Sequence, residues 1–492
     1  MIENRADSVF LLAELPRTAY VMPGLNGWEG ALRELGIDLT DSRRRTPAEL
    51  VVGVGSAERD LPLLGSQAVI LEGGSEIGRL RGLGYSCEDF APIPAPGRAE
   101  VLLPARDPRC ARYAFRRSPP SARWKRSRNE LLIRMLARGM RPPGVTLITT
   151  AQRSPGQPFL VRAASEMLAE VDGWLLTPAQ GDALSRGTLH IFSAGAAEPT
   201  WVIKFARVPG YSKSFDRDEK GLAVVQAAGE RVARRAPALL GRFQYRGLHA
   251  SVETAAVGRP LASFLTSNAP RAEKLELVDE IAGWIADLGS ATAQPAGALN
   301  EERARLREVV AAYAELGASP ALVDDLPELP AVSQHNDLGT WNIIVDRSRA
   351  EWRFTVVDWE SARRHGMPLW DLWYFLQHAL AEIDGVTGLG PTDLQAREEH
   401  AARLFRGELP ASAIVVRWTR AVQRALQIPS EALGRLATLC FLHHGLSQSE
   451  RERNVSEFGA GSAALEMLGP RLARRWLADR RLGPDWQPCA RS

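Results

Sequence analysis

The chain has 492 residues and a mass of 53.9 kDa, more than one ordinary hydrophobic core organises, which predicts two or three domains. Its 45% apolar and 24% charged residues are typical of globular proteins, and a net charge of +3 gives no reason to expect a nucleic-acid partner. No stretch approaches the roughly 18 consecutive apolar residues of a membrane span. The four cysteines show no CxxC spacing and fit a reducing compartment, so we expect a cytoplasmic protein.

The first part of the chain alternates short apolar runs with Gly or Pro. Runs such as QAVILEGG (67–74) and AEVLLPA (99–105) are typical of buried strands, and WEGALRELG (28–36) has helical spacing. We therefore expect a small Rossmann-like α/β domain over 1–118, followed by a basic linker and helix over 119–143. The glycine turns of this domain do not form GxGxxG, so they favour a structural role over a nucleotide site.

The basic run at 109–128 contains no acidic residue. We interpret it as a solvated segment, with an anionic surface or a polyphosphate as the alternative contact.

The pattern changes near residue 144. Five apolar runs, with one helix at about 216–235 among them, predict an antiparallel β-lobe over 144–258. The runs are GVTLITT (144–150), GWLLTPA (173–179), GTLHIFSA (187–194), PTWVIKFAR (199–207) and ASVETAAVG (250–258). From about 260 the apolar residues recur at three- and four-residue steps, which predicts a helical lobe over 259–492.

One polar loop in the helical lobe holds the residues on which the functional prediction depends. The stretch SQHNDLGTWNIIVD (333–346) places Asp337 and Asn342 five residues apart, just before an apolar run, and Asp358 ends the next such run in RFTVVDWE. Phosphoryl transfer needs hard oxygen ligands for Mg²⁺ and a carboxylate that orients the attacking hydroxyl. We predict that Asp337 is the base and that Asn342 and Asp358 are metal ligands.

A cation for the nucleotide phosphates is also available. Lys204 lies within the apolar strand WVIKFAR of the β-lobe. In the next helix, the spacing of Glu219 from apolar residues predicts a position near the buried face, where it would pair with Lys204. Asp216 and Asp218 are the alternatives for this pair.

HNDLGTWNIIV, followed by VVDWESARRHGMPLWDL, resembles the aminoglycoside phosphotransferase/choline kinase family. The resemblance covers about 145–480 and is specific over 333–375. It implies an α+β, two-lobed protein-kinase-like fold and the ATP- and Mg²⁺-dependent transfer of the γ-phosphate to a small-molecule hydroxyl. In that family's terms the catalytic aspartate is Asp337, the metal ligands are Asn342 and Asp358, the lysine–glutamate pair is Lys204 and Glu219, the loop supports are His335 and Asp371, and the adenine contacts lie around Thr254 to Ala256.

The chain departs from related kinases at three places. Asn336 stands where protein kinases usually carry Arg, which favours a small-molecule substrate over a protein. The spacing of 16 positions from Asn342 to Asp358 predicts a longer hairpin turn. The loop AQGDALSRG (179–187) lacks GxGxxG, which weakens Ser185 and Gly187 as phosphate contacts.

Other functions stay open at this point. The chain could be a non-catalytic kinase-like nucleotide-binding module, or an auxiliary to an N-terminal domain that binds a nucleotide sugar or S-adenosylmethionine. The acceptor and the oligomeric state are also open. We interpret the aromatic residues near the loop as core packing rather than as a cage for a cationic amine; they are Trp341, Trp359, Trp370, Trp373 and Tyr374.

Overall fold

The computed structural model describes residues 4–25, 27–40, 48–54, 66–73, 77–93, 99–117, 130–136, 138, 140, 146–179, 184–347, 351–388, 391–457, 468–479 and 481–488. The chain folds into two compact units. The first comprises Met1–Phe215 and Ala238–Val257, and the second comprises Asp216–Pro237 and Gly258–Ser492. Helix α6 (Lys213–Ala227) crosses from the first unit into the second.

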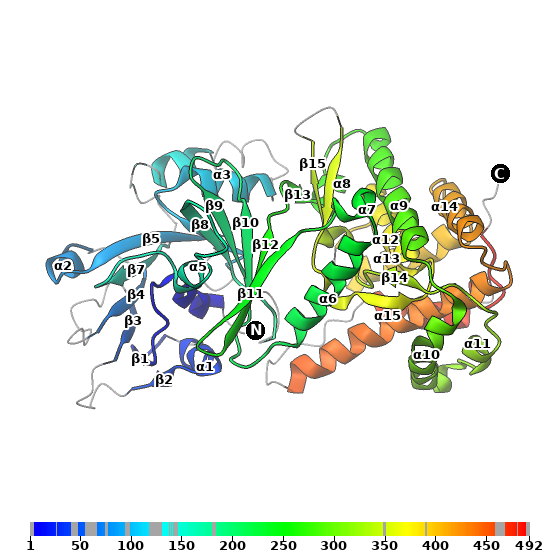
Figure 1. Ribbon diagram of the computed structural model, residues 1–492, viewed down its shortest axis with the longest axis horizontal. Coiled ribbons are helices and arrows are strands. Elements are labelled where there is room, and N and C mark those ends of the chain that lie inside the picture. The colour runs from blue at the N-terminus through cyan, green and yellow to red at the C-terminus, as the bar shows by residue number, and fades with distance from the viewer. Residues whose placement is uncertain are drawn as a thin grey trace. The chain divides into compact units, whose positions relative to one another are not determined.

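A single sheet organises the first unit (Figure 1). Its strands in the described part of the chain follow the order β11-β12-β10-β9-β8-β6-β5-β7-β4-β3-β1-β2. Their bounds are β1 (Thr18–Val21), β2 (Asp38–Leu39), β3 (Leu50–Val54), β4 (Ala68–Glu72), β5 (Ser86–Ile93), β6 (Val101–Pro104), β7 (Ile148–Gln152), β8 (Val171–Thr177), β9 (Gly187–Ser193), β10 (Trp201–Phe205), β11 (Leu239–Tyr245) and β12 (Leu248–Thr254).

This sheet is parallel at one end and antiparallel over the rest. Strands β2, β1, β3 and β4 pair in parallel, as an α/β domain requires, whereas β8, β9, β10 and β12 form the predicted antiparallel lobe. The two parts are joined, because β7 pairs with β4 and β5, and β6 pairs with β8. The expected boundaries at 118 and 143 therefore do not interrupt the sheet, and a separate Rossmann-like domain stays a prediction.

Short helices accompany the sheet. They are η1 (Asn4–Leu11), α1 (Trp28–Glu34), α2 (Ile77–Gly82), α3 (Pro108–Arg117) and α5 (Phe159–Ala163). The start of the basic run thus forms α3, which buries Cys110 and Tyr113. Most of the predicted linker at 119–143 lies outside the described residues, as does Cys489.

The N-terminal segment is part of the core that supports β10. The ring of Phe10 in η1 lies 4.2 Å from that of Phe205, the residue after Lys204. Two residues beyond Phe205, Arg207 Nε lies 2.8 Å from Asp7 Oδ1, and both side chains are buried. The start of the chain is therefore packed against the strand on which a nucleotide-binding lysine is predicted.

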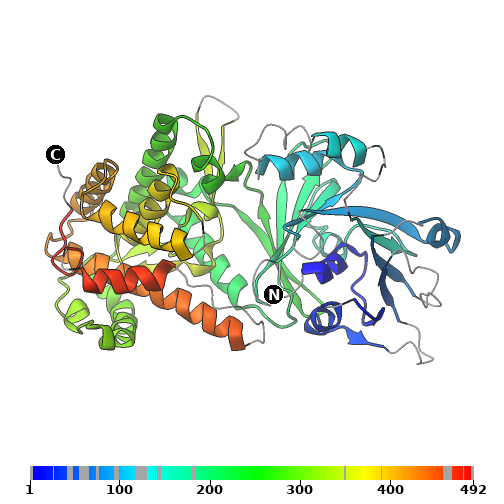
Figure 2. The same ribbon diagram turned by 180° about the vertical axis from the view of Figure 1, so that it is seen from behind.

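The second unit is mainly helical (Figure 2). Its helices in the described residues, after α6, are α7 (Glu230–Ala233), α8 (Leu261–Leu265), α9 (Arg271–Thr292), η4 (Ala296–Leu299), α10 (Asn300–Ala312), η5 (Ala314–Leu316), α11 (Ala321–Asp324), η6 (Thr340–Asn342), η7 (Trp359–Ser361), α12 (Trp370–Ile383), α13 (Pro391–Phe405), α14 (Ser412–Ala425), α15 (Ala432–Glu457) and α16 (Leu468–Ala478). Within the described ranges, no helix combines the length and the hydropathy of a membrane-spanning segment.

Two small sheets frame the polar loop. Strand β15 (Ile343–Asp346) pairs with β13 (Arg259–Pro260) and β16 (Arg353–Val356), and β14 (Val332–Gln334) pairs with β17 (Arg363–Gly366). The pairing of β15 with β16 confirms the predicted hairpin. Helix α12 is rich in apolar residues and is buried from Trp370 to Ala381, and its buried Asp371 contacts the polar loop.

Candidate active site

The loop between β14 and η6 is held by one carboxylate. Asp371, in the first turn of α12, accepts a hydrogen bond at Oδ2 from the amide of His335 (2.6 Å) and at Oδ1 from the amide of Asn336 (2.8 Å). Burial raises the pKa of Asp371, and the two amides oppose that rise. The bracing role predicted for Asp371 rests on these two bonds.

His335 connects the loop to the strand that precedes Asp358. Its buried ring lies 2.9 Å through Nε2 from the carbonyl oxygen of Val357. Because a carbonyl can only accept, Nε2 carries the proton, and Nδ1 is left to accept the amide of Asp337 at 3.4 Å. The ring of Trp359 meets this imidazole edge-on at 4.8 Å.

Asp337 is oriented by two donors. Asn342 Nδ2 lies 3.1 Å from Asp337 Oδ2 and 2.9 Å from the Asp337 carbonyl oxygen. Both partners are acceptors, which places the amide nitrogen of Asn342 on this side and its oxygen Oδ1 on the other. The hydroxyl of Tyr374 donates to Asp337 Oδ1 at 3.3 Å. Burial and the neighbouring Asp337 raise the pKa of Tyr374, so it stays protonated and acts as a donor.

Tyr374 is a site residue that the sequence analysis placed in the core instead. It is 5% exposed, so that interpretation is right for its ring, but the hydroxyl reaches Asp337. A signal was present in the sequence: Tyr374 follows Asp371 by three residues, which places both on one helix face.

Several residues in and near this loop have a strained backbone with positive φ. The described residues include six non-glycine positions with positive φ, and three of them are Asn336 (65°), Asp358 (68°) and Leu369 (73°). A left-handed conformation costs an L-residue roughly 1–2 kcal/mol and persists where the surroundings enforce it, often at functional sites. Near Asp358, the amide of Val357 donates to the carbonyl oxygen of Asn342 at 2.9 Å. The structure therefore brings Asp337, Asn342 and Asp358 to one junction.

These residues fit a hard cation. The described residues contain no cluster of three or more His, Cys, Asp or Glu side chains that could hold a metal ion. Mg²⁺, however, is usually bound by one or two carboxylates together with waters and substrate phosphates. The Asp358 carboxylate and Asn342 Oδ1 provide oxygens of the required kind.

Lys204 is found with a carboxylate that the sequence analysis missed. Its Nζ lies 3.0 Å from Oε1 of Glu253 on the adjacent strand β12, and the two side chains are 12% and 3% exposed. Glu219 is exposed, contrary to the expected buried position, whereas the alternative Asp218 is 3% exposed. The pairing of Lys204 with an acid of α6 stays a prediction.

Thr254 and Gly187, two candidate nucleotide contacts, both take part in the packing of the sheet. The Thr254 amide donates to the carbonyl oxygen of Ala238 at 3.0 Å and is thus engaged in the strand pairing, while an adenine contact at Ala256 stays a prediction. At Gly187, a Cβ would lie 2.3 Å from the ring of Phe205, so packing alone requires glycine there. Ser185 stays a prediction.

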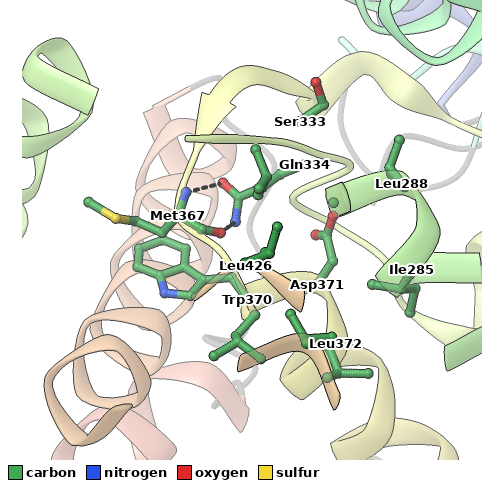
Figure 3. A pocket seen from close by; sticks show the side chains of 13 residues that line it. Ile285, Leu288, Ser333, Gln334, Met367, Trp370, Asp371, Leu372 and Leu426 are labelled. Atoms are coloured by element: carbon green, nitrogen blue, oxygen red, sulfur yellow. Dashed lines mark hydrogen bonds between the residues drawn. The ribbon is translucent and has the colours of Figure 1, made fainter. Parts of the chain in front are cut away.

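A cavity of about 20 Å³ lies behind the loop (Figure 3). Its wall includes Asp371, Trp370 and Gln334; Gln334 donates to the Met367 carbonyl oxygen at 2.8 Å and accepts the Met367 amide at 3.1 Å. This volume holds about one water molecule, so the cavity is a small gap in the packing of the loop support and not a nucleotide pocket.

The other side of Asp337 carries aromatic and uncharged groups. The Tyr374 ring stacks on His444 at 4.0 Å and meets His378 at 4.7 Å. Burial lowers the pKa of both histidines to about 3, with Arg397 adding to the effect at His378 and Arg305 at His444. Both imidazoles are therefore neutral near pH 7.

The chain combines a β-rich lobe and a helical lobe with a polar loop that contains His335, Asp337 and Asn342, and Asp358 follows the next hairpin. These features define a phosphotransferase of the protein-kinase-like class. Residues 191–412 match the model of the phosphotransferase enzyme family. Residues 1–190 lie outside the match. Strands of the family region and strands that precede it thus share one sheet.

The chain is also similar to several solved structures. An aminoglycoside-3'-phosphotransferase of type VIII is 18% identical, with 54% of this chain and 96% of that one covered and a TM-score of 0.31. The aminoglycoside phosphotransferase APH(3'')-Id from Streptomyces rimosus, in complex with ADP and streptomycin, is 16% identical, with 56% and 97% covered and a TM-score of 0.29. The kinase domain of Mycobacterium tuberculosis PknI is 13% identical, with 52% and 89% covered and a TM-score of 0.27. No curated protein matches the chain. At these identities and TM-scores, the assignment rests on the family match.

Proposed function

We propose that this phosphotransferase uses ATP and Mg²⁺ to phosphorylate a hydroxyl of a small molecule. The observation that carries the proposal is that the Asp337 carboxylate accepts two hydrogen bonds, one from the Tyr374 hydroxyl at 3.3 Å and one from Asn342 Nδ2 at 3.1 Å. A carboxylate fixed in this way can orient an attacking hydroxyl and accept its proton. The acceptor oxygen then attacks the γ-phosphorus, and the bond from that phosphorus to the β,γ-bridging oxygen breaks.

The remaining charges of the reaction have proposed partners. Lys204 would hold the nucleotide phosphates, and Glu253, 3.0 Å from its ammonium group, would keep it extended along the sheet. Asn342 Oδ1 and the Asp358 carboxylate would hold Mg²⁺. When bound, this ion neutralises charge on the phosphate oxygens.

The surroundings of Asp337 favour an acceptor with little positive charge. His378 and His444 are neutral, and the cation Arg397 lies 3.0 Å from His378. Trp341 is 43% exposed and meets the Tyr374 ring at 6.3 Å, so an open aromatic face lies beside the residue that contacts Asp337. We therefore expect sugars or other uncharged polyols to be better acceptors than polycationic aminoglycosides.

The test is phosphoryl transfer from γ-labelled ATP to panels of polyols, amino alcohols and aminoglycosides. Wild-type protein should label at least one acceptor in a Mg²⁺-dependent manner, and Asp337→Asn should lower the rate about 10²–10⁴-fold. Asp358→Ala should also lower it, whereas Glu308→Gln, which changes an exposed carboxylate of α10, should not.

Other results would point to the alternatives. Stabilisation by Mg·ATP without transfer to any acceptor would indicate a non-catalytic nucleotide-binding module. Binding of S-adenosylmethionine or a nucleotide sugar to the full chain, without any effect of ATP, would assign the activity to the N-terminal part instead.

A further inference from the structure

We propose that Glu302 of α10 and His443 of α15 are positioning residues that fix the Asp337 loop through Asn336. Glu302, Arg305, His443 and Asn336 form a continuous chain of polar side chains in the second unit. This inference rests on the proposed function, because the loop that it positions is the one that carries Asp337.

The link to the loop has a defined direction. Arg305 Nη1 lies 3.0 Å from His443 Nδ1, and His443 Nε2 lies 3.0 Å from Asn336 Oδ1. A guanidinium group can only donate, so Nδ1 must accept and Nε2 must carry the proton that is donated to Asn336. Burial lowers the pKa of His443 well below its usual range, and nearby His444, Arg305 and Arg363 act in the same direction. His443 therefore stays in this one neutral tautomer.

Asn336 needs this support because its backbone is strained. It has a φ of 65°, and it immediately precedes Asp337. Its amide is fixed by Asp371 Oδ1 at 2.8 Å and its side chain by His443, so it is held from both ends. The direction in which the next residue projects is thereby determined.

Glu302 joins this chain to the segment that follows Asp358. The carboxylate is 5% exposed and accepts hydrogen bonds from Arg305, including one from Nε at 3.0 Å. Its Oε2 also accepts Arg363 Nη1 at 3.1 Å, and Arg363 begins β17, just after η7. The buried carboxylate of Glu302 is thus linked to the residue before Asp337, through Arg305 and His443, and to the segment that follows Asp358, through Arg363.

The geometry suits a permanently ordered loop. Two guanidinium groups share one buried carboxylate, and charge-assisted hydrogen bonds of this kind are stronger than bonds between neutral groups. Because the anion belongs to the protein itself, ordering of the loop requires no added phosphate or ligand. Loss of the link at His443 should therefore loosen the loop without altering the lysine that is predicted to hold ATP.

The test compares His443→Phe, His443→Gln and Glu302→Gln with a control, Arg307→Gln. Phe removes both hydrogen bonds, whereas the amide of Gln can accept from Arg305 and donate to Asn336. The control removes an exposed ion pair of the same helix, between Arg307 and Asp324. Two quantities are measured: hydrogen exchange of peptides that cover 333–342, and kcat and KM for ATP with the acceptor that wild type uses best.

We expect faster exchange of the loop in His443→Phe and Glu302→Gln, with kcat about 10–100-fold lower and KM for ATP nearly unchanged. His443→Gln and Arg307→Gln should resemble wild type. Unchanged exchange and kcat in His443→Phe would overturn the proposal, and if that variant does not fold, Glu302→Gln decides by the same criteria. Hydrogen exchange reports on the loop even if wild type transfers no phosphate, a result that would count against the proposed function alone.

Discussion

Glu382 of α12 should make the stability of the second unit depend on pH near neutrality. Its Oε1 accepts a hydrogen bond from the hydroxyl of Thr340, the first residue of η6, at 2.7 Å. Burial raises the pKa of Glu382 from 4.5 to about 7, against the opposing effects of Thr340 and Arg397. The folded protein therefore binds this proton more tightly than the unfolded chain does.

The sign and size follow from linkage. The stabilisation due to the proton is fully present below pH 4.5 and is lost as the pH rises through 7. A shift from 4.5 to about 7 is roughly 2.5 pKa units, which at about 1.4 kcal/mol per unit amounts to roughly 3 kcal/mol. Most of this loss should fall between about pH 5 and 8.

The perturbation is Glu382→Gln, which keeps an acceptor for Thr340 but cannot ionise. Urea unfolding at pH 5 and pH 8 should show the variant gaining roughly 2–3 kcal/mol on wild type over that range. Glu276→Gln, which changes an exposed carboxylate of α9, is the control and should show no such gain. An equal difference between Glu382→Gln and wild type at both pH values would refute the reasoning.

Two further predictions concern stability. Asp7→Asn leaves the buried guanidinium of Arg207 without its counter-charge, so it should lower the free energy of unfolding by about 3–5 kcal/mol. Denaturant titration measures this loss, and a loss below about 1 kcal/mol would mean that the ion pair is solvated. Gly258→Ala should cost more than about 1 kcal/mol, because φ is +120° and the new Cβ would lie 2.2 Å from the carbonyl oxygen of Val345. Gly297→Ala is the control, because a Cβ added at Gly297 would have no other heavy atom within 4 Å. Equal denaturant midpoints for the two variants would contradict the expected backbone strain at residue 258.

The contact between Asp337 and Asn342 could be predicted from the sequence because it is local, whereas the catalytic and metal-binding roles of these residues stay predictions. Asp337 and Asn342 lie five residues apart, so the spacing that lets them touch is written in one short segment. The β15–β16 hairpin and Asp358 at its end follow from alternation and turn length in the same way. The family match over 191–412 includes this segment.

The acid on α6 shows where the pattern was too coarse. Each residue of a helix turns by about 100°, so an error of one position moves a side chain from the buried to the exposed face. Glu219 and Asp218 differ by that single step, and only packing shows that Asp218 is the buried one.

By itself, the sequence determined the local contact of Asp337 with Asn342, the alternation of strands and helices, and the order of a β-rich part followed by a helical part. Tertiary structure alone decided which distant groups meet: Asp7 with Arg207, Lys204 with Glu253, and His443 with Asn336. It also decided that β7 lies between β4 and β5, which joins the N-terminal strands to the lobe that carries Lys204. The physical reason is that strand order and buried polar pairing are long-range contacts, and no local periodicity encodes which partner is chosen.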